Sequence, residues 1–212
     1  MKASFWFNKW EKGEIGFHES EANQLLQKYV EKFNLTQADR VFLPLCGKTR
    51  DIAWLLAAGY KVVGAELSQL AITDLFKDLV LEPVITQLGE LIHFSAKDID
   101  IFVGDIFKLT SEIIGAIDVI YDRAALVALP QNIRGQYTAH LIKITNNATQ
   151  LLITFEYDQT IMNGPPFCID ENEVNNHYTK FYEISSLENK AIVGGFRGNV
   201  EASERAWFLQ KK

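Results

Sequence analysis

Short apolar runs alternate with amphipathic segments through most of the chain. The first apolar run starts at Val41 and breaks at Pro44 and then at Gly47. An amphipathic segment over residues 50–58 follows, and the next apolar run, residues 61–66, ends on an acid. The pattern predicts a strand, a turn, a helix and a second strand, which together form the nucleotide-binding half of a doubly wound α/β domain.

Similar patterns predict elements on both sides of this segment. We expect one helix from a Ser20 cap to about residue 33 and another from a Ser68 cap to about residue 79. A strand at 117–121 should end where Asp122 begins a loop. The other expected elements are strands at 91–96, 100–103, 151–157, 181–187 and 205–209, and helices that begin near Pro130 and Asp170.

The order of these elements predicts the fold class. Strands that alternate with helices favour an α/β, Rossmann-like domain with a mainly parallel, twisted sheet and helices on both faces. The last two strands predict an antiparallel C-terminal hairpin. Because no linker or internal repeat interrupts the chain, we expect its 212 residues to form a single domain. Residues 36–212 would form the core, and residues 1–35 an arm and a helix that act as a lid.

Composition and charge narrow the class of partner and the compartment. The net charge of −6, with no run of Lys or Arg, argues against a nucleic-acid partner. Cys46 and Cys168 lack metal-ligand spacing, so we predict two reduced thiols and no metal. No apolar run approaches the ~20 residues that a membrane span needs, and no signal peptide is evident. We therefore expect a cytoplasmic protein, monomeric and without a membrane partner.

The turn after the first strand indicates which cofactor the domain can hold. A dinucleotide site needs a glycine-rich G-x-G-x-x-G turn, and a P-loop needs a further upstream glycine, but this turn contains only Gly47. A nicotinamide oxidoreductase is thus disfavoured, and Gly47-Lys48-Thr49 is interpreted as a chance match to the P-loop. A smaller ligand without phosphates, S-adenosylmethionine, fits one glycine.

Acids at the ends of the next two strands support this cofactor. Glu66 follows Gly47 at about the 20-residue separation expected for an acid that binds a ribose diol. Asp105 ends the following strand region, where a group that contacts adenine would lie. Both have plainer alternatives: Glu66 as a solvated acid that caps the next helix, and Asp105 as a turn residue after Gly104.

Six segments together carry a resemblance to a known family. The specific motifs are Pro-Leu-Cys-Gly-Lys at 44–48 and Asp-Arg-Ala-Ala-Leu-Val-Ala at 122–128. The remaining segments are residues 6–18, 62–68, 104–107 and 164–167. In these segments the chain resembles bacterial thiopurine S-methyltransferases, whereas its C-terminal quarter follows the family poorly.

The resemblance implies a class I methyltransferase fold and a set of site residues. Its implied S-adenosylmethionine site consists of Trp6, Trp10, Leu45, Glu66, Asp105, Ile106 and Arg123. Phe17 matches a position that faces the methyl acceptor, and Arg197 matches an arginine near the acceptor, with Arg205 as a rival for that role. The aromatic N-terminal arm would then cover the site and exclude water, although its aromatic residues could equally be plain hydrophobic anchors.

The implied reaction is S-methylation of small aromatic or heterocyclic thiols. An in-line transfer needs aligned reactants rather than a nucleophilic side chain. A nearby cation would favour the thiolate, which makes Arg123 and Arg197 the candidate catalytic residues. Arg123 could instead form a structural salt bridge with Asp122. Two alternatives remain open: a methyltransferase for other soft nucleophiles, such as selenite, tellurite or thiocyanate, and a non-catalytic module that only binds S-adenosylmethionine.

Overall fold

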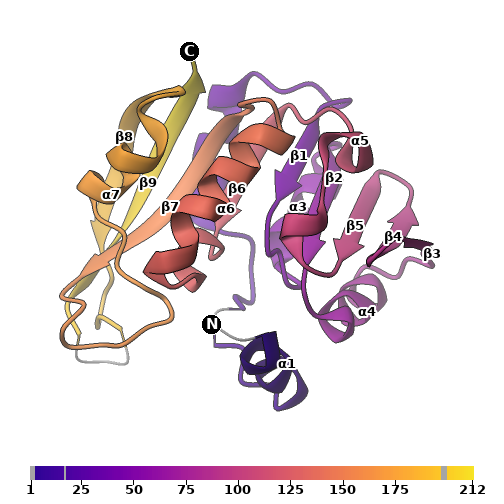
Figure 1. The fold of residues 1–212 in the computed structure, drawn as a ribbon, viewed down its shortest axis with the longest axis horizontal. Coiled ribbons are helices and arrows are strands. Elements are labelled where there is room, and N and C mark those ends of the chain that lie inside the picture. The colour runs from indigo at the N-terminus through magenta and orange to yellow at the C-terminus, as the bar shows by residue number, and fades with distance from the viewer. Residues whose placement is uncertain (1–2, 17, 197–199) are drawn as a thin grey trace. The chain divides into compact units, whose positions relative to one another are not determined.

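The chain divides into two compact units, Met1–Val119 and Ile120–Lys212. The computed structural model describes residues 3–16, 18–196 and 200–212, and its elements are labelled in Figure 1. Among these described residues, no helix is long and apolar enough to cross a membrane. Each unit combines strands with helices, as the alternation along the sequence predicts.

The first unit contains five strands in the order β3-β4-β5-β2-β1. Strands β1, β2 and β5 are parallel, and their registers place Leu43 opposite Gly64 and Glu66 opposite Val103. Strands β3, β4 and β5 pair antiparallel. The strands are β1 (Arg40–Leu43), β2 (Lys61–Glu66), β3 (Val84–Leu88), β4 (Leu91–Ala96) and β5 (Ile99–Val103). The predicted strands at 91–96 and 100–103 are confirmed as β4 and β5. Strand β3 was not predicted, so this unit is more mixed than expected.

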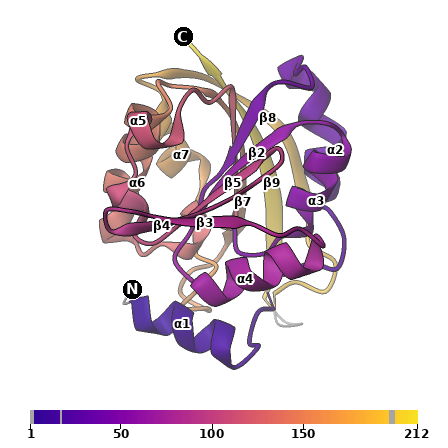
Figure 2. The ribbon, with the colours of Figure 1, turned by 90° about the vertical axis from the view of Figure 1, so that its right-hand side faces the viewer.

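Helices flank these strands on both sides (Figure 2), with α5 on one side and α2 and α3 on the other. The elements are α2 (Gln24–Tyr29), η1 (Val30–Phe33), α3 (Arg50–Ala57), α4 (Gln69–Asp78), η2 (Ile106–Lys108) and α5 (Ser111–Ile114). The predicted cap of α4 is confirmed, because the Ser68 hydroxyl accepts a hydrogen bond from the Ala71 amide. Helix α3 lies where it was expected and ends before Gly59, whose φ of 89° suits glycine.

The expectation for the N-terminal segment was wrong in one respect. The helix expected from Ser20 begins instead at Gln24, because Asn23 caps it and its side-chain oxygen accepts from the amides of Leu25 and Leu26. Asn23 can do so because the buried Asp51 carboxylate accepts a 2.7 Å hydrogen bond from its amide and holds it in place. The arm before it contains a helix that was not expected, α1 (Ala3–Glu11), which contacts α4.

The second unit contains four strands in the order β6-β7-β9-β8. Pairs β7–β9 and β8–β9 are antiparallel, so the predicted C-terminal hairpin is confirmed. Its elements are β6 (Val119–Arg123), η3 (Leu126–Ala128), α6 (Gln131–Ile144), β7 (Thr149–Tyr157), α7 (Glu171–Tyr178), β8 (Tyr182–Ala191) and β9 (Ala202–Lys211). Strand β6 runs two residues further than predicted, which places Asp122 and Arg123 at its end instead of in a loop. Helices α6 and α7 lie on one face of this unit's strands (Figure 1).

Candidate active site

Glu66 is the centre of the carboxyl edge of the first unit. Because β1, β2 and β5 are parallel, the turns that follow them meet at this edge. The buried Glu66 carboxylate joins two of these turns: it accepts 2.8 Å hydrogen bonds from the Gly47 amide and from the Ser68 amide. Burial raises the pKa of Glu66, against the lowering effect of these amides. Glu66 is therefore an ordered buried acid, and the alternative of a solvated acid is wrong.

The backbone of the first turn takes conformations that most residues avoid. Leu45 has a φ of 48° and Gly47 a φ of 52°. The positive φ at Leu45 costs about 1–2 kcal/mol for a residue with a Cβ, and such strain is concentrated at functional sites. The Cys46 amide donates to the carbonyl of Ala65 over 2.9 Å, which fixes the turn against β2. The turn is thus held in an unusual shape that brings the Gly47 amide to Glu66.

Trp10 lies against this turn. A Cβ atom built on Gly47 would be 3.0 Å from Cζ2 of the Trp10 indole, so any other residue at this position would crowd the ring. Trp10 is buried, whereas Trp6 is half-buried and makes an edge contact with Phe5. The aromatic arm thus reaches the predicted cofactor turn through Trp10. Phe17, the predicted acceptor-facing residue, lies outside the described residues.

The Gly-Lys-Thr sequence in the turn has structural roles. Lys48 forms an ion pair with Asp78 over 3.5 Å. Thr49 caps α3, because its hydroxyl accepts from the Asp51 amide. The buried Cys46 packs towards Gly64, where a Cβ atom would approach its sulfur to 3.0 Å. Burial raises the pKa of the Cys46 thiol well above its ordinary value, which disfavours a nucleophilic thiolate.

Asp105 and Ile106 follow β5 at the same edge. The exposed Asp105 caps η2, because its carboxylate accepts from the Phe107 amide over 3.0 Å. Ile106 is buried. Gly104, with a φ of 141°, donates its amide to the carbonyl of Glu66, which ties this turn to β2. The structure thus brings Leu45, Glu66, Asp105 and Ile106 to one edge, as the sequence predicts for a nucleotide site.

Arg123 ends β6 in the second unit, next to a buried acid. The Asp122 carboxylate accepts from the Leu126 amide over 3.1 Å and from the Tyr137 hydroxyl over 2.7 Å. Burial raises the pKa of Asp122 to about 6, against the lowering effect of these hydrogen bonds. Ala124, with a φ of 63°, turns the chain directly after Arg123. Asp122 therefore shapes the segment that carries Arg123.

Of the two C-terminal arginines considered for the acceptor, the structure describes only Arg205. Arg197 lies outside the described residues. Arg205 is 9% exposed and is engaged within the second unit. It forms ion pairs of 2.6 Å with Glu156 and 3.2 Å with Glu171, and its guanidinium lies 4.1 Å from the Trp207 ring centroid. These contacts give Arg205 a structural role between β7, α7 and β9.

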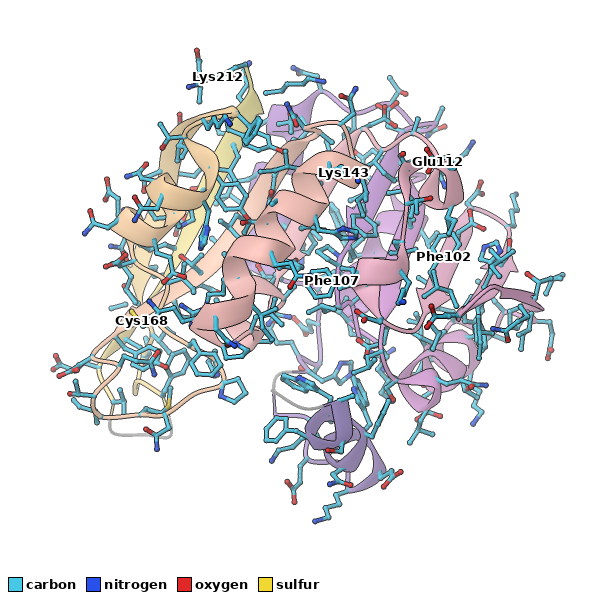
Figure 3. All side chains as sticks on the ribbon, in the orientation of Figure 1. Phe102, Phe107, Glu112, Lys143, Cys168 and Lys212 are labelled. Atoms are coloured by element: carbon cyan, nitrogen blue, oxygen red, sulfur yellow. The ribbon has the colours of Figure 1, made fainter. Side chains whose placement is uncertain are left out.

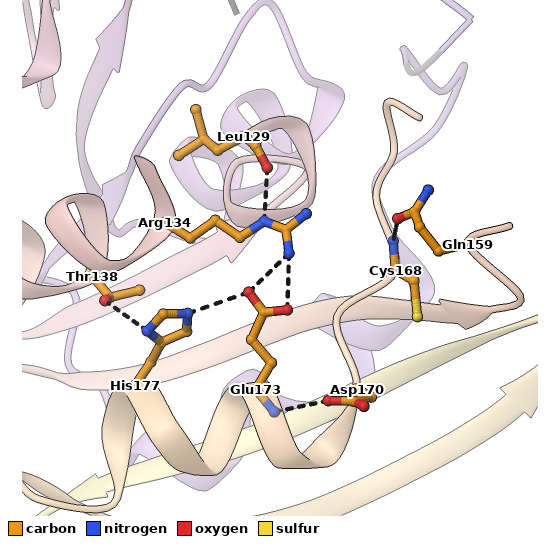
Figure 4. A network of polar contacts seen from close by, with 8 residues as sticks. All are labelled: Leu129, Arg134, Thr138, Gln159, Cys168, Asp170, Glu173 and His177. Atoms are coloured by element: carbon orange, nitrogen blue, oxygen red, sulfur yellow. Dashed lines mark hydrogen bonds and ion pairs between the residues drawn. The ribbon is translucent and has the colours of Figure 1, made fainter. Parts of the chain in front are cut away.

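The loop at 164–167 is held by residues that the sequence analysis did not single out. Arg134 on α6 donates to both carboxylate oxygens of Glu173 on α7, each over 2.8 Å (Figure 4). The Arg134 guanidinium also lies over the Phe167 ring. The backbone amide of Cys168, which follows this loop (Figure 3), donates a 2.9 Å hydrogen bond to the side-chain oxygen of Gln159. The pair joins residues 39 positions apart, so no local pattern in the sequence announces it.

Comparison with known proteins decides the family. The family model described as thiopurine S-methyltransferase matches residues 1–212. The chain belongs to the thiopurine S-methyltransferase family. Relatives of that name occur in Xanthobacter autotrophicus, 45% identical over 100% of both chains, and in Teredinibacter turnerae, 47% identical over 100% of this chain and 98% of the relative. Membership confirms the resemblance and the enzyme class, a methyltransferase that uses S-adenosylmethionine, so the oxidoreductase alternative is wrong.

Solved structures confirm the fold class. A methyltransferase from Anabaena variabilis superimposes with a TM-score of 0.66 over 99% of this chain and 95% of that chain, at 12% identity. The magnesium protoporphyrin IX methyltransferase of Synechocystis, solved with bound S-adenosylhomocysteine, gives a TM-score of 0.63 over 99% and 96%, at 13% identity. The α/β class I methyltransferase fold predicted for this thiopurine S-methyltransferase family member is thereby confirmed.

The residues at the carboxyl edge of the first unit fit S-adenosylmethionine. Each oxygen of a carboxylate has two lone pairs, so Glu66 can accept hydrogen bonds from a ribose diol in addition to those from the backbone. The ligand carries no pyrophosphate, which agrees with a turn that has one glycine. The Trp10 indole lies beside Gly47, and aromatic rings attract cations such as a sulfonium.

Proposed function

We propose that this methyltransferase acts on the sulfur of small aromatic or heterocyclic thiols, with thiopurines among its acceptors. The observation that carries the proposal is the family match over residues 1–212, whose model and curated relatives bear the name thiopurine S-methyltransferase. The specific motif at 122–128, which contains Arg123, belongs to the matched range. We place the acceptor-facing groups of the second unit in this motif and in the loop at 164–167.

We assign cofactor binding to Trp6, Trp10, Leu45, Glu66, Asp105, Ile106 and Arg123. Glu66 would accept hydrogen bonds from the ribose hydroxyls, and Trp10 would lie beside the sulfonium end, because it contacts the turn at Gly47. Asp105 and Ile106 would contact the adenine, one through a polar edge and the other through a buried apolar side chain. When bound, S-adenosylmethionine supplies an activated methyl group that a sulfur nucleophile can accept by direct displacement.

The remaining task of the chain is to hold a thiolate in line. A positive charge beside the acceptor lowers the pKa of its thiol, and we assign this role to Arg123 and Arg197. Phe17 would cover the acceptor ring, and the arm that precedes it would exclude water. Alignment of the two reactants converts a bimolecular step into an effectively unimolecular one, so no covalent intermediate with the chain is required.

Two measurements on the purified protein test the proposal. Calorimetric titration compares S-adenosylmethionine, S-adenosylhomocysteine and NAD, and a methylation assay compares mercaptopurine, thiophenol, selenite, tellurite and thiocyanate. We expect binding of the first two ligands, none of NAD, and turnover of the aromatic thiols. Turnover of selenite, tellurite or thiocyanate alone would assign the site to other soft nucleophiles. Cofactor binding without turnover of any acceptor would identify a binding module and overturn the proposal.

A further inference from the structure

Arg134 is a buried cation to which the proposed reaction assigns no role. It is 4% exposed and lies on α6, four residues after Pro130. Its Nε donates to the carbonyl of Leu129 over 2.8 Å, and its Nη1 donates to both carboxylate oxygens of Glu173, each over 2.8 Å (Figure 4). Glu173 also contacts Nε2 of His177 over 3.3 Å. The guanidinium thus links the start of α6 to the first turn of α7.

The same guanidinium lies over Phe167. The distance from its central carbon to the ring centroid is 5.2 Å. The ring is close to Gly164 on the other side of the loop, since a Cβ atom at Gly164 would be 2.6 Å from Cδ1 of Phe167. The Phe167 amide donates to the carbonyl of Val127 over 2.7 Å. Phe167 is therefore fixed between its own loop, Arg134 and the segment that follows Arg123.

These contacts bring two motif segments together. Val127 and Leu129 belong to or directly follow the segment at 122–128, and Phe167 belongs to the loop at 164–167. Arg134 contacts both, through the Leu129 carbonyl and through the Phe167 ring. Neither contact is made to a group that reacts, so Arg134 can act only by fixing the positions of other residues.

A buried ion pair is a costly way to hold two helices together. Desolvation of both charges offsets much of their attraction, and an apolar pair of similar volume often stabilises a fold as well. A guanidinium, however, can stack on a ring with its face while it donates hydrogen bonds in its plane, which an ammonium cannot do. Burial raises the pKa of Glu173, but the hydrogen bonds and charges of His177 and Arg134 outweigh this and bring it below its ordinary value. Glu173 therefore stays ionised and keeps the guanidinium oriented.

We infer that Arg134, oriented by Glu173, is a positioning residue that sets the loop at 164–167 against the segment after Arg123 and so shapes the acceptor side of the site. The inference rests on the proposed function, because only that function places a methyl acceptor beside these segments. It concerns affinity for the acceptor rather than for the cofactor, whose assigned residues lie mostly in the first unit.

The test uses Arg134→Lys and Glu173→Gln in the full chain. Lysine keeps the charge but loses the ring stacking and the planar hydrogen bonds, and glutamine keeps the shape but loses the charge. We expect Arg134→Lys to raise KM for mercaptopurine at least 5-fold and Glu173→Gln at least 2-fold. The kcat should change less than 3-fold, and affinity for S-adenosylhomocysteine should be unchanged. Arg40→Lys is the matched control, because Arg40 also donates to backbone carbonyls, those of Ile114 and Ala116, but in the first unit.

A second readout does not depend on turnover. Hydrogen exchange of the Phe167 amide, which bonds to Val127, should be at least 10-fold faster in Arg134→Lys than in the wild type. Wild-type exchange at Phe167 together with a wild-type KM would overturn the inference. If the wild-type protein methylates no thiol, the proposed function fails while the exchange measurement still decides whether Arg134 fixes the loop; unchanged exchange then overturns the inference. A parallel rise of KM in Arg40→Lys would also overturn it, since the effect would then be unspecific.

Discussion

At the scale of single residues, Glu66 carries the clearest expectation. Its carboxylate is buried and joins the turns after β1 and β2 through the amides of Gly47 and Ser68. Glu66→Ala removes the proposed acceptor for the ribose and should weaken S-adenosylhomocysteine binding by ~1–3 kcal/mol, the scale of hydrogen bonds to a charged group. Calorimetric titration measures the change. Glu90→Ala, which removes an exposed acid of the same unit, is the control. Equal affinities of the Glu66→Ala and Glu90→Ala proteins would remove Glu66 from the site.

Asp122 gives a prediction about pH. Its pKa is raised from 3.8 to about 6 by burial, so between these pH values the folded state binds more protons than the unfolded state. Protonated Asp122 therefore contributes fully to the unfolding free energy well below pH 3.8, and this contribution is lost as the pH rises through about 6. A shift of this size corresponds to about 3 kcal/mol. Asparagine keeps an oxygen for the Leu126 amide and can donate to the Tyr137 hydroxyl, but it does not titrate.

Urea unfolding of the wild type and Asp122→Asn at several pH values measures this difference. From pH 4 to pH 7, the wild type should lose about 2 kcal/mol of unfolding free energy relative to the variant, because at pH 4 part of the unfolded chain has already lost this proton. The control is Asp98→Asn in the exposed turn between β4 and β5, which removes one charge without a buried site. Curves for the wild type and Asp122→Asn that stay parallel over this range would contradict the prediction.

At the scale of elements, α1 approaches the cofactor turn through Trp10. The Trp10 ring of α1 lies 3.0 Å from the position that a Cβ atom of Gly47 would take, which is tighter than an ordinary contact. Gly47→Ala should therefore strain the positive φ and also displace Trp10, for a total loss of about 2–3 kcal/mol of unfolding free energy. Gly13→Ala is the matched control, because Gly13 has a φ of 66° with nothing within 4 Å of the added methyl group.

The comparison of the two variants isolates the contact. Chemical unfolding should show a larger loss for Gly47→Ala, and limited proteolysis should cleave α1 faster in this variant than in Gly13→Ala. Equal losses and equal cleavage rates would mean that the Trp10 contact does not hold α1.

Elements were predictable from sequence where the signal is local. Ser68 before an amphipathic run and Gly59 after one mark helix ends by their own chemistry, and the structure agrees. Ser20 failed because the choice between it and Asn23 depends on Asp51, 28 residues after Asn23 along the chain. Strand β3 was missed because all five of its residues are exposed and give no alternation.

The candidate site likewise contains residues that local sequence predicts and residues that it does not. Glu66 was predictable, because the length of a strand–helix–strand unit fixes its separation from the first turn. Its hydrogen bonds to Gly47 and Ser68 follow from that placement. The pair of Arg134 and Glu173 was not predictable, since it depends on how α6 and α7 pack. Pairwise contacts between helices leave no periodic mark in a sequence.

At the scale of the whole molecule, the assigned groups fall into two parts of the chain. The residues from Trp6 to Ile106 that we propose for the cofactor belong to the unit Met1–Val119, and Arg123, with the residues that fix its segment, belongs to Ile120–Lys212. The uninterrupted sequence predicts one domain, so the folding of the two units should be coupled.

Calorimetric unfolding tests this coupling. We expect a single transition whose calorimetric enthalpy equals the van't Hoff enthalpy. S-adenosylhomocysteine at about 100 times its Kd should add about 2.7 kcal/mol, because it binds only the folded state. For a chain of this size, that corresponds to an increase in Tm of about 5–10 °C, with the whole transition shifted. NAD at the same concentration is the ligand control, and Glu66→Ala should reduce the shift. Two separate transitions, of which the ligand moves only one, would show that the units fold independently and that the single-domain prediction is wrong.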